Sequence, residues 1–144
     1  MFVLTPGGQA TQNLVNEAFL RKMKKTAVLV NTSRGSVVDS DALAKALREG
    51  WIWAAGLDVV AGEPNIQTDH PLIQEPRLFF LDFSVQYIMF MFFIFFLFSR
   101  CVILPHIGSA TLQTRWDMAA LAVKNVLAAI SGSEMPASVD MNTI

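Results

Sequence analysis

Continuous apolar runs and helix-periodic stripes alternate along this chain. The run Thr26–Asn31 (TAVLVN) is rich in β-branched residues, a pattern typical of a strand buried on both faces of a parallel sheet. Ile52–Val59 and Cys101–Leu104 show the same character. Met1–Leu4 has the composition of a strand end that enters a Pro-Gly-Gly loop. These four segments predict a parallel sheet.

Between these runs, apolar residues recur at helical spacing and are bounded by capping residues. They predict a short helix before residue 26, a second over residues 39–50 and a long one after the last strand. The predicted caps and ends are, in order, Asn16; Asp39 or Ser40 with Gly50; and Ser109 or Thr111 with Gly132. Strand, helix and strand over residues 26–59 have the size of a right-handed parallel crossover unit, so the pattern predicts the α/β class.

The apolar residues are not evenly spread. They make up 53% of the 144 residues, and nine of the 11 phenylalanines fall between Phe79 and Phe98. The segment Leu78–Phe98 holds 18 apolar residues of 21, whereas the rest of the chain has an ordinary apolar content. Its length is just enough to cross a bilayer, with Asp82 as its single charge. The chain therefore combines a soluble type of domain with one segment of membrane-like composition.

Charge and cysteine usage narrow the function classes. A formal net charge of −1 argues against a nucleic-acid binder. The basic run over residues 21–25 is expected to face solvent rather than bind phosphate. One cysteine, Cys101, and two histidines make neither a disulfide nor a metal set, and we assign His70 to a packing turn. With no signal-peptide pattern at the N-terminus, we expect a reducing, cytoplasmic compartment and no metal.

Polar side chains follow the predicted strands at the edge of the sheet where ligands bind. Arg34 follows the strand predicted over residues 26–31. Its guanidinium can hold a carboxylate with two hydrogen bonds. The imidazole of His106 can move a proton near neutral pH, and a carboxylate on its distal nitrogen would fix the tautomer. This set suits a reaction on a carboxylate-bearing carbonyl compound. Taken singly, each residue has a structural explanation: ion pairing for Arg34, loop bonding for Asp58, a solvated loop for Glu63 and helix capping for His106.

Three strings carry a family resemblance. They are VNTSRGSVVDSDALAKAL (30–47), AAGLDVVAGEP (54–64) and VILPHIGSAT (102–111). In this order they resemble the C-terminal signatures of the D-isomer-specific 2-hydroxyacid dehydrogenases, and LTP at 4–6 and HPL at 70–72 fall where that family has them. PHIGSAT and the following MAALAVKNVLAAISG most resemble the glyoxylate reductase/hydroxypyruvate reductase branch. The joint occurrence of these strings outweighs the separate structural explanations.

The resemblance implies an oxidoreductase that transfers hydride between NAD(P)H and a small 2-oxo acid such as glyoxylate or hydroxypyruvate. It makes Arg34 the binder of the substrate carboxylate, His106 the acid/base and Glu63 the carboxylate that pairs with His106. The cofactor is NAD or NADP, and intact members are expected to be homodimers. The implied cofactor-binding positions are Thr5, Thr32, Asp58 and Gly108.

The resemblance covers only the C-terminal portion of the family's fold. We therefore expect an incomplete fold: the C-terminal half of a Rossmann-type NAD(P)-binding domain with a parallel sheet, plus a long C-terminal helix. Residues 1–77 and 101–131 form this partial domain, 78–100 are a hydrophobic insertion and 132–144 are a tail. The sequence contains no GxGxxG turn to seat a pyrophosphate. The isolated chain is therefore expected neither to bind NAD(P)H tightly nor to turn over.

The insertion has two explanations. As a genuine segment, Leu78–Phe98 would attach the protein to a membrane, although one crossing between adjacent strands of a sheet would separate those strands. As translated noncoding sequence it would be absent from a spliced transcript, and we favour this because the family pattern resumes at Cys101. Two function hypotheses follow: a dehydrogenase fragment, or a noncatalytic derivative that serves as an interaction module, with or without membrane attachment.

Overall fold

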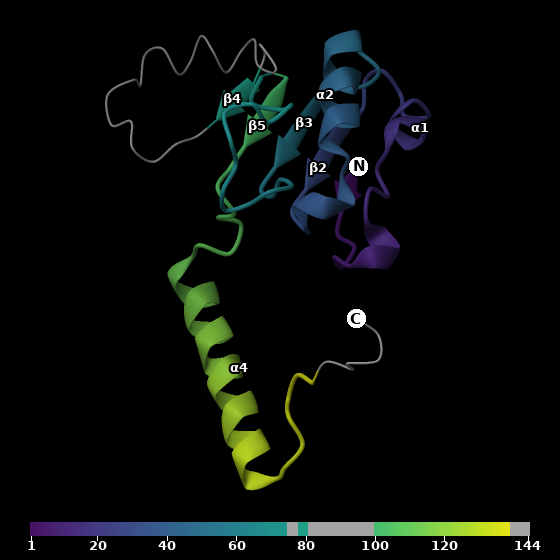
Figure 1. The fold of residues 1–144 in the computed structure, drawn as a ribbon. Helices are drawn as coiled ribbons and strands as arrows, with labels where there is room; N and C mark the ends of the chain where they lie inside the picture. Colours follow the sequence, from purple (N-terminus) through teal and green to yellow (C-terminus); the bar gives the residue numbers. More distant parts are fainter. Residues whose placement is uncertain (75–77, 81–99, 139–144) are drawn as a thin grey trace, which may run out of the picture. The chain divides into compact units, whose positions relative to one another are not determined.

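The structure is a computed structural model that describes residues 1–74, 78–80 and 100–138. The chain forms two compact units, Met1–His106 and Ile107–Ile144. The first unit holds a sheet with its helices, and the second holds one long helix (Figure 1). The predicted α/β class is confirmed.

The sheet has five strands, all parallel, in the order β1-β2-β3-β5-β4 (Figure 1). Their bounds are Phe2–Val3 for β1, Val28–Asn31 for β2, Ala54–Leu57 for β3, Leu78–Phe80 for β4 and Cys101–Ile103 for β5. Asn31 is in register with both Val3 and Leu57, and Leu57 is in register with Ile103. The carboxyl ends of β1, β2, β3 and β5 therefore meet at one edge, which the loops with the predicted polar residues leave.

Helix α2 (Ser40–Glu49) connects β2 to β3, as the crossover pattern predicted. The Asp39 carboxylate caps it by accepting the backbone N–H of Ala42 at 3.0 Å. Gly50 ends it with φ 72°, a left-handed conformation in which a residue without a Cβ avoids a steric penalty. The sequence thus determines both ends of this helix locally.

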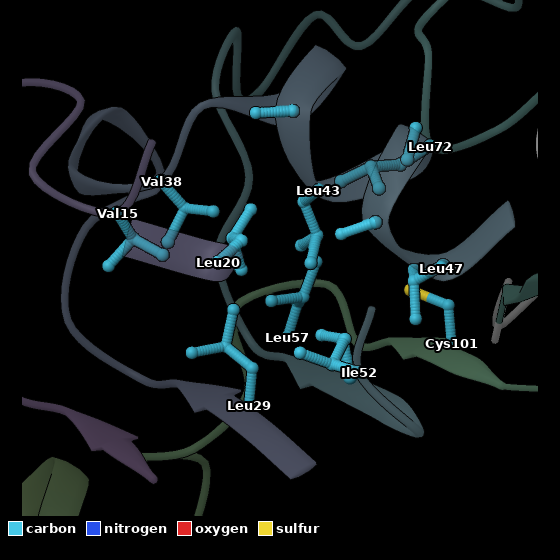
Figure 2. Close-up of a cluster of buried hydrophobic side chains, with 14 of the residues drawn as sticks. Val15, Leu20, Leu29, Val38, Leu43, Leu47, Ile52, Leu57, Leu72 and Cys101 are labelled. Atoms are coloured by element: carbon cyan, nitrogen blue, oxygen red, sulfur yellow. The ribbon is translucent and has the colours of Figure 1, made fainter. Parts of the chain in front are cut away.

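The hydrophobic core lies between α2 and the sheet (Figure 2). Leu43 and Leu47 of α2 are buried together with Leu29 of β2 and Leu57 of β3. Each such leucine stabilises the fold by about 1.5–3 kcal/mol relative to an exposed one. Leu72, from the HPL string, joins the same cluster. This core holds the strands, and so the loops at their carboxyl ends, in fixed relative positions.

Helix α1 (Glu17–Leu20) is shorter than the sequence predicts. The predicted cap is confirmed, because Asn16 Oδ1 accepts the backbone N–H of Phe19 at 3.1 Å. After Leu20 the backbone continues as a tight turn, in which the N–H of Met23 bonds to the Leu20 carbonyl at 3.1 Å. The basic residues beyond position 21 therefore lie outside the helix. Two short 3-10 helices, η1 (Gln9–Thr11) and η2 (Gly35–Val37), were not predicted.

Most of the predicted insertion, residues 81–99, lies outside the described residues. Its first three residues form β4, an edge strand that the sequence analysis did not predict. β4 pairs with β5, with Leu78 opposite Cys101 and Phe80 opposite Ile103. An open sheet edge offers unpaired N–H and C=O groups to any adjacent extended segment, which explains the pairing. The division of the chain at residues 77 and 78 stays a prediction.

Helix α4 (Leu112–Ser131) makes up most of the second unit. Thr111 caps it by accepting the N–H of Thr114 at 3.2 Å, and Gly132 ends it with φ 68°. The Asn125 side chain bonds to both the N–H and the C=O of Ala137 at 3.0 Å, so the chain after the helix returns along it. None of the residues of α4 is buried. Among the described helices, none combines the length and apolar character that a membrane crossing requires.

Candidate active site

The loops after β2, β3 and β5 surround a cleft of about 760 Å³ at the carboxyl edge of the sheet. Arg34 comes from the first loop, Glu63 from the second and His106 from the third. The structure thus brings together the three residues that the sequence nominated for chemistry. The remainder of the lining is largely apolar and includes Val60, Ile66, Ile103 and Leu104.

Glu63 and His106 form a hydrogen-bonded pair. Glu63 Oε2 lies 2.9 Å from Nδ1 of His106, and Glu63 Oε1 accepts the backbone N–H of Val60 at 2.7 Å. Both carboxylate oxygens are therefore engaged, which orients the carboxylate. A carboxylate at Nδ1 favours the tautomer that carries its proton there, so Nε2 is the ring nitrogen left for a ligand.

The backbone of His106 has φ 53°, a left-handed conformation that is uncommon for a residue with a side chain. Its N–H donates to the carbonyls of Asp58 and Leu104, both at 3.0 Å. Such a conformation costs about 1–2 kcal/mol and persists only where neighbouring contacts hold it. The loop after β3 thus fixes His106 twice, through Glu63 on the ring and through Asp58 on the backbone.

Arg34 is exposed and lines the cleft. Its Nη1 donates to the Ser33 carbonyl at 2.8 Å. The aliphatic part of the side chain passes close to Gly7, where an added Cβ would lie 2.8 Å from Cγ of Arg34. The Pro-Gly-Gly loop after β1 therefore limits where the Arg34 side chain can go, a role for Gly7 that the sequence analysis missed.

Gly35 sets the distance between two of the loops. A Cβ on this residue would lie 2.0 Å from the Val60 carbonyl carbon and 2.4 Å from the Ala61 nitrogen. Because these are backbone atoms that cannot rotate away, only glycine fits there. The close approach brings the loop that carries Arg34 against the loop that carries Glu63.

Asn31, which was not among the residues predicted for the site, is fully buried at the end of β2. Its Nδ2 donates to the Arg34 carbonyl at 2.9 Å, and its Oδ1 accepts from the Ser33 N–H at 3.0 Å and the Ser33 hydroxyl at 2.8 Å. The available signal was a polar residue that closes an apolar run. Its partners could not be read from the run itself.

The implied cofactor residues occupy different surroundings. Thr5 Oγ1 is buried and has no hydrogen-bond partner among the described residues. Thr32 is exposed, whereas Asp58 is buried and donates its backbone N–H to the Asn31 carbonyl at 2.9 Å. Gly108 belongs to the second unit. The orphaned Thr5 hydroxyl at the carboxyl end of β1 fits a ligand with a hydrogen-bonding group, as a dinucleotide has.

His70, in the HPL string, lies outside the cleft lining. Its Nδ1 accepts the backbone N–H of Leu72 at 3.3 Å. Burial disfavours the charged ring and lowers the pKa of His70, although Asp41, the backbone of Ala61 and Asp69 act in the opposite direction. The neutral ring therefore supports the turn, in agreement with the packing role that we assigned to it. Among the described residues there is no group of side chains that could hold a metal ion.

The parallel sheet and the polar groups at its carboxyl edge define a partial dinucleotide-binding domain of the dehydrogenase type. Residues 1–82 match the family model described as "D-isomer specific 2-hydroxyacid dehydrogenase, NAD binding domain". The chain therefore belongs to the D-isomer-specific 2-hydroxyacid dehydrogenases and carries part of their NAD-binding domain. The family prediction is confirmed.

Named relatives belong to the predicted branch. The chain is 42% identical over 139 residues to the glyoxylate reductase of Thermofilum pendens. This aligned region covers 96% of this chain and 34% of that protein. It is 44% identical over 138 residues to the human glyoxylate reductase/hydroxypyruvate reductase, with coverages of 96% and 34%. The chain thus spans about a third of the length of these curated relatives.

Solved structures show the same similarity. The NADPH-dependent glyoxylate/hydroxypyruvate reductase of Sinorhizobium meliloti, in complex with NADP and malonate, matches with a TM-score of 0.72 and 33% identity over 96% of this chain and 35% of that one. A glyoxylate reductase of Paecilomyes thermophila matches with a TM-score of 0.73 and 29% identity over 98% of this chain and 35% of that one. The predicted Rossmann-type half-fold is confirmed.

Proposed function

We propose that this chain carries the carboxylate-binding and acid–base residues of an NAD(P)-dependent reductase of small 2-oxo acids, with glyoxylate or hydroxypyruvate as the substrate. The observation that carries the proposal is the Glu63–His106 pair, with 2.9 Å between Oε2 and Nδ1, on the same cleft as Arg34. A cation, a proton donor and an orienting carboxylate are the groups that reduction of a 2-oxo acid requires. The names of the relatives support the substrate class.

In this proposal each residue has a separate task. The Arg34 guanidinium holds the carboxylate of the 2-oxo acid with paired hydrogen bonds. His106 gives the proton on Nε2 to the carbonyl oxygen as that oxygen becomes a hydroxyl, and Glu63 stabilises the imidazolium that precedes the transfer. NAD(P)H, when bound, supplies the hydride to the carbonyl carbon. The products are then a 2-hydroxy acid, NAD(P)⁺ and a neutral His106.

We assign the cofactor side of the site to Thr5, Thr32, Asp58 and Gly108. The unpartnered hydroxyl of Thr5 supports this assignment, because a buried donor without a partner costs about 1–3 kcal/mol unless a ligand satisfies it. The chain spans about a third of its relatives, so we expect it to bind NAD(P)H weakly and not to turn over alone. Homodimers of the intact protein and a cytoplasmic location belong to the same proposal, the latter because one cysteine suits a reducing compartment.

A binding experiment on the full 144-residue chain tests the carboxylate role of Arg34. Glyoxylate should shift the amide resonances of Arg34 and His106, whereas glycolaldehyde, which lacks the carboxylate, should not. Arg34→Gln should abolish these shifts, and Arg34→Lys should weaken them because an ammonium lacks the planar fork of a guanidinium. Equal binding of glyoxylate by the chain and by Arg34→Gln would contradict the proposal.

The noncatalytic alternative makes a different prediction for the same experiment. An interaction module that had lost its chemistry would show no difference between glyoxylate and glycolaldehyde. The exposed apolar residues of α4 are the observation in its favour, since they offer a surface for a second protein. A carboxylate-dependent shift at Arg34 would favour the reductase.

A further inference from the structure

The side chain of Asn31, at the end of β2, forms hydrogen bonds with the loop that carries Arg34. Asn31 is fully buried, and it is the last residue of β2, paired in register with both neighbouring strands. Its backbone is therefore held by the sheet, and its carbonyl accepts the N–H of Asp58 at 2.9 Å. A side chain on such a fixed backbone has a fixed place from which to hold the next residues.

The Asn31 amide makes three hydrogen bonds to the loop, and all three go to residues 33 and 34. Its Oδ1 accepts from the N–H and the hydroxyl of Ser33 at 3.0 and 2.8 Å, and its Nδ2 donates to the Arg34 carbonyl at 2.9 Å. The Ser33 carbonyl in turn accepts a hydrogen bond from Nη1 of Arg34 at 2.8 Å. The amide thus holds the backbone on both sides of the Cα of Arg34.

Only an amide can make this set of contacts. A carboxylate at position 31 would accept from Ser33 but could not donate to the Arg34 carbonyl, and it would place a charge in a fully buried site. An aliphatic side chain would leave the Ser33 donors and the Arg34 carbonyl to find other partners. Each lost hydrogen bond at this partly buried site weakens the preference of the loop for its path.

We propose that Asn31 is a positioning residue for the Arg34 guanidinium: its buried amide sets the path of the loop from Thr32 to Arg34 and so keeps the guanidinium on the cleft. The inference rests on the proposed function, in which Arg34 receives the substrate's carboxylate. Asn31 itself does not line the cleft, so it acts through Arg34 and not on the ligand.

The competing explanation is that Asn31 only satisfies polar groups in the interior. The two explanations differ in where the damage appears when the amide is removed. A structural residue affects stability and leaves a folded variant with a normal Arg34. A positioning residue loosens Arg34 even at temperatures where the variant is fully folded.

The test uses the full chain and three variants, with NMR as the measurement. Asn31→Leu removes all three hydrogen bonds, Ser33→Ala removes only the hydroxyl bond at a partly buried residue, and Leu29→Ala is the matched control. Leu29 is buried on the same strand two residues earlier, so its truncation destabilises the fold without touching the loop. The readouts are the order parameter of the Arg34 Nε–Hε bond, with Arg115 as reference, and the dissociation constant for malonate, with malonamide as the uncharged control.

We expect Asn31→Leu to lower the order parameter of Arg34 and to weaken malonate binding about tenfold, the equivalent of about 1.4 kcal/mol. Ser33→Ala should act in the same direction with a smaller effect, and it decides the matter if Asn31→Leu does not fold. Leu29→Ala should leave both readouts unchanged.

Three results would overturn the assignment: an unchanged Arg34 in folded Asn31→Leu and in Ser33→Ala, equal changes in Leu29→Ala, or a looser Arg34 with unchanged malonate affinity. If malonate binds no form of the chain, the carboxylate role of Arg34 fails instead, and the ligand-free order parameter still decides whether Asn31 positions it.

Discussion

Helices α2 and α4 begin and end in the same way but differ in what surrounds them. Each starts at a side-chain cap, Asp39 or Thr111, and each ends at a glycine in the left-handed conformation, with φ 72° at Gly50 and φ 68° at Gly132. α2 buries five residues, Ala42, Leu43, Ala44, Ala46 and Leu47, whereas α4 buries none. Local signals therefore determine where a helix starts and stops, and they do not determine whether its apolar residues find a partner.

The candidate site depends on the helix that is packed, α2, and not on α4. The apolar stripe of α2 packs on the sheet (Figure 2). This packing holds the strands in place, and so the loops that carry Arg34 and Glu63. The apolar residues of α4 include Trp116 and Ile130, which are 67% and 79% exposed. Since the chain spans about a third of its curated relatives, a helix with uncovered apolar residues is the expected result.

The largest expected effect is a difference between the two helices in how much the truncation of a leucine lowers the free energy of unfolding. Leu43→Ala, at a residue with 0% exposure, should lower the free energy of unfolding by about 2–5 kcal/mol. Leu127→Ala, at a residue with 60% exposure, should change it by less than about 0.5 kcal/mol. Urea unfolding measures both: the fluorescence of Trp51 and Trp53, in a Trp116→Phe background, reports the first unit, and NMR resonances of α4 residues report the second. Equal losses would show that α4 is as well packed as α2.

The next effect concerns self-association. Exposed apolar residues on α4 should make the chain associate with itself, because burying a leucine gains about 1.5–3 kcal/mol. Leu127→Glu should therefore raise the dissociation constant of the associated form by about tenfold or more. Lys124→Glu, a charge change on the same helix, is the control and should act more weakly. Sedimentation velocity over a range of concentrations is the measurement, and a chain that stays monomeric throughout would contradict the prediction.

A smaller effect should be equal in the two helices. Gly50→Ala and Gly132→Ala each place a Cβ on a left-handed residue and should cost about 1–2 kcal/mol. The first should lower the stability of the sheet unit, and the second should fray the end of α4 in NMR chemical shifts. Gly50→Asn and Gly132→Asn should cost less, since asparagine tolerates this conformation. If alanine is harmless at either position, the cap of that helix is not set by its glycine.

The smallest effect is a pH dependence confined to the first unit. Burial lowers the pKa of His70 below its ordinary value of about 6.5, so the unfolded chain takes up this proton more readily than the folded one. The contribution of neutral His70 is complete above about pH 6.5 and is lost as the pH falls toward the lowered value. Urea unfolding from pH 7.5 to 5.0 should show this slope, and His70→Gln should reduce it. The helicity of α4 should not follow it, and an unchanged slope in the variant would show that another group is responsible.

Much of the fold could be predicted from periodicity. The runs at 26–31, 52–59 and 101–104 contain β2, β3 and β5, and the caps at Asn16, Asp39 and Thr111 were among those predicted. Lengths were less accurate, because α1 ends at Leu20 where the basic run begins. β4 could not be predicted, since its pairing depends on an open edge beside Cys101–Ile103 rather than on its own residues.

The site was predicted through its chemistry but not through its supports. Arg34, Glu63 and His106 carry reactive groups and follow strands, so residue type and position were enough to nominate them. Gly7 and Gly35 carry no reactive group, and the polar residue Asn31 at the end of an apolar run does not reveal its partners. Gly7 and Gly35 contribute space for neighbouring loops, which matters only once the strands are side by side. Asn31 contributes local hydrogen bonds from a side chain that becomes buried only between β1 and β3.

The sequence by itself determined the parallel α/β order, the helix ends and the family, because propensity, capping and motif strings are local properties of the chain. Only the tertiary structure decided that Glu63 lies 2.9 Å from His106, that Asn31 is buried in the sheet between β1 and β3, and that α2 buries its apolar stripe against the strands. These facts depend on contacts between residues far apart in the chain, and such contacts follow from how the strands align and pack rather than from any one segment.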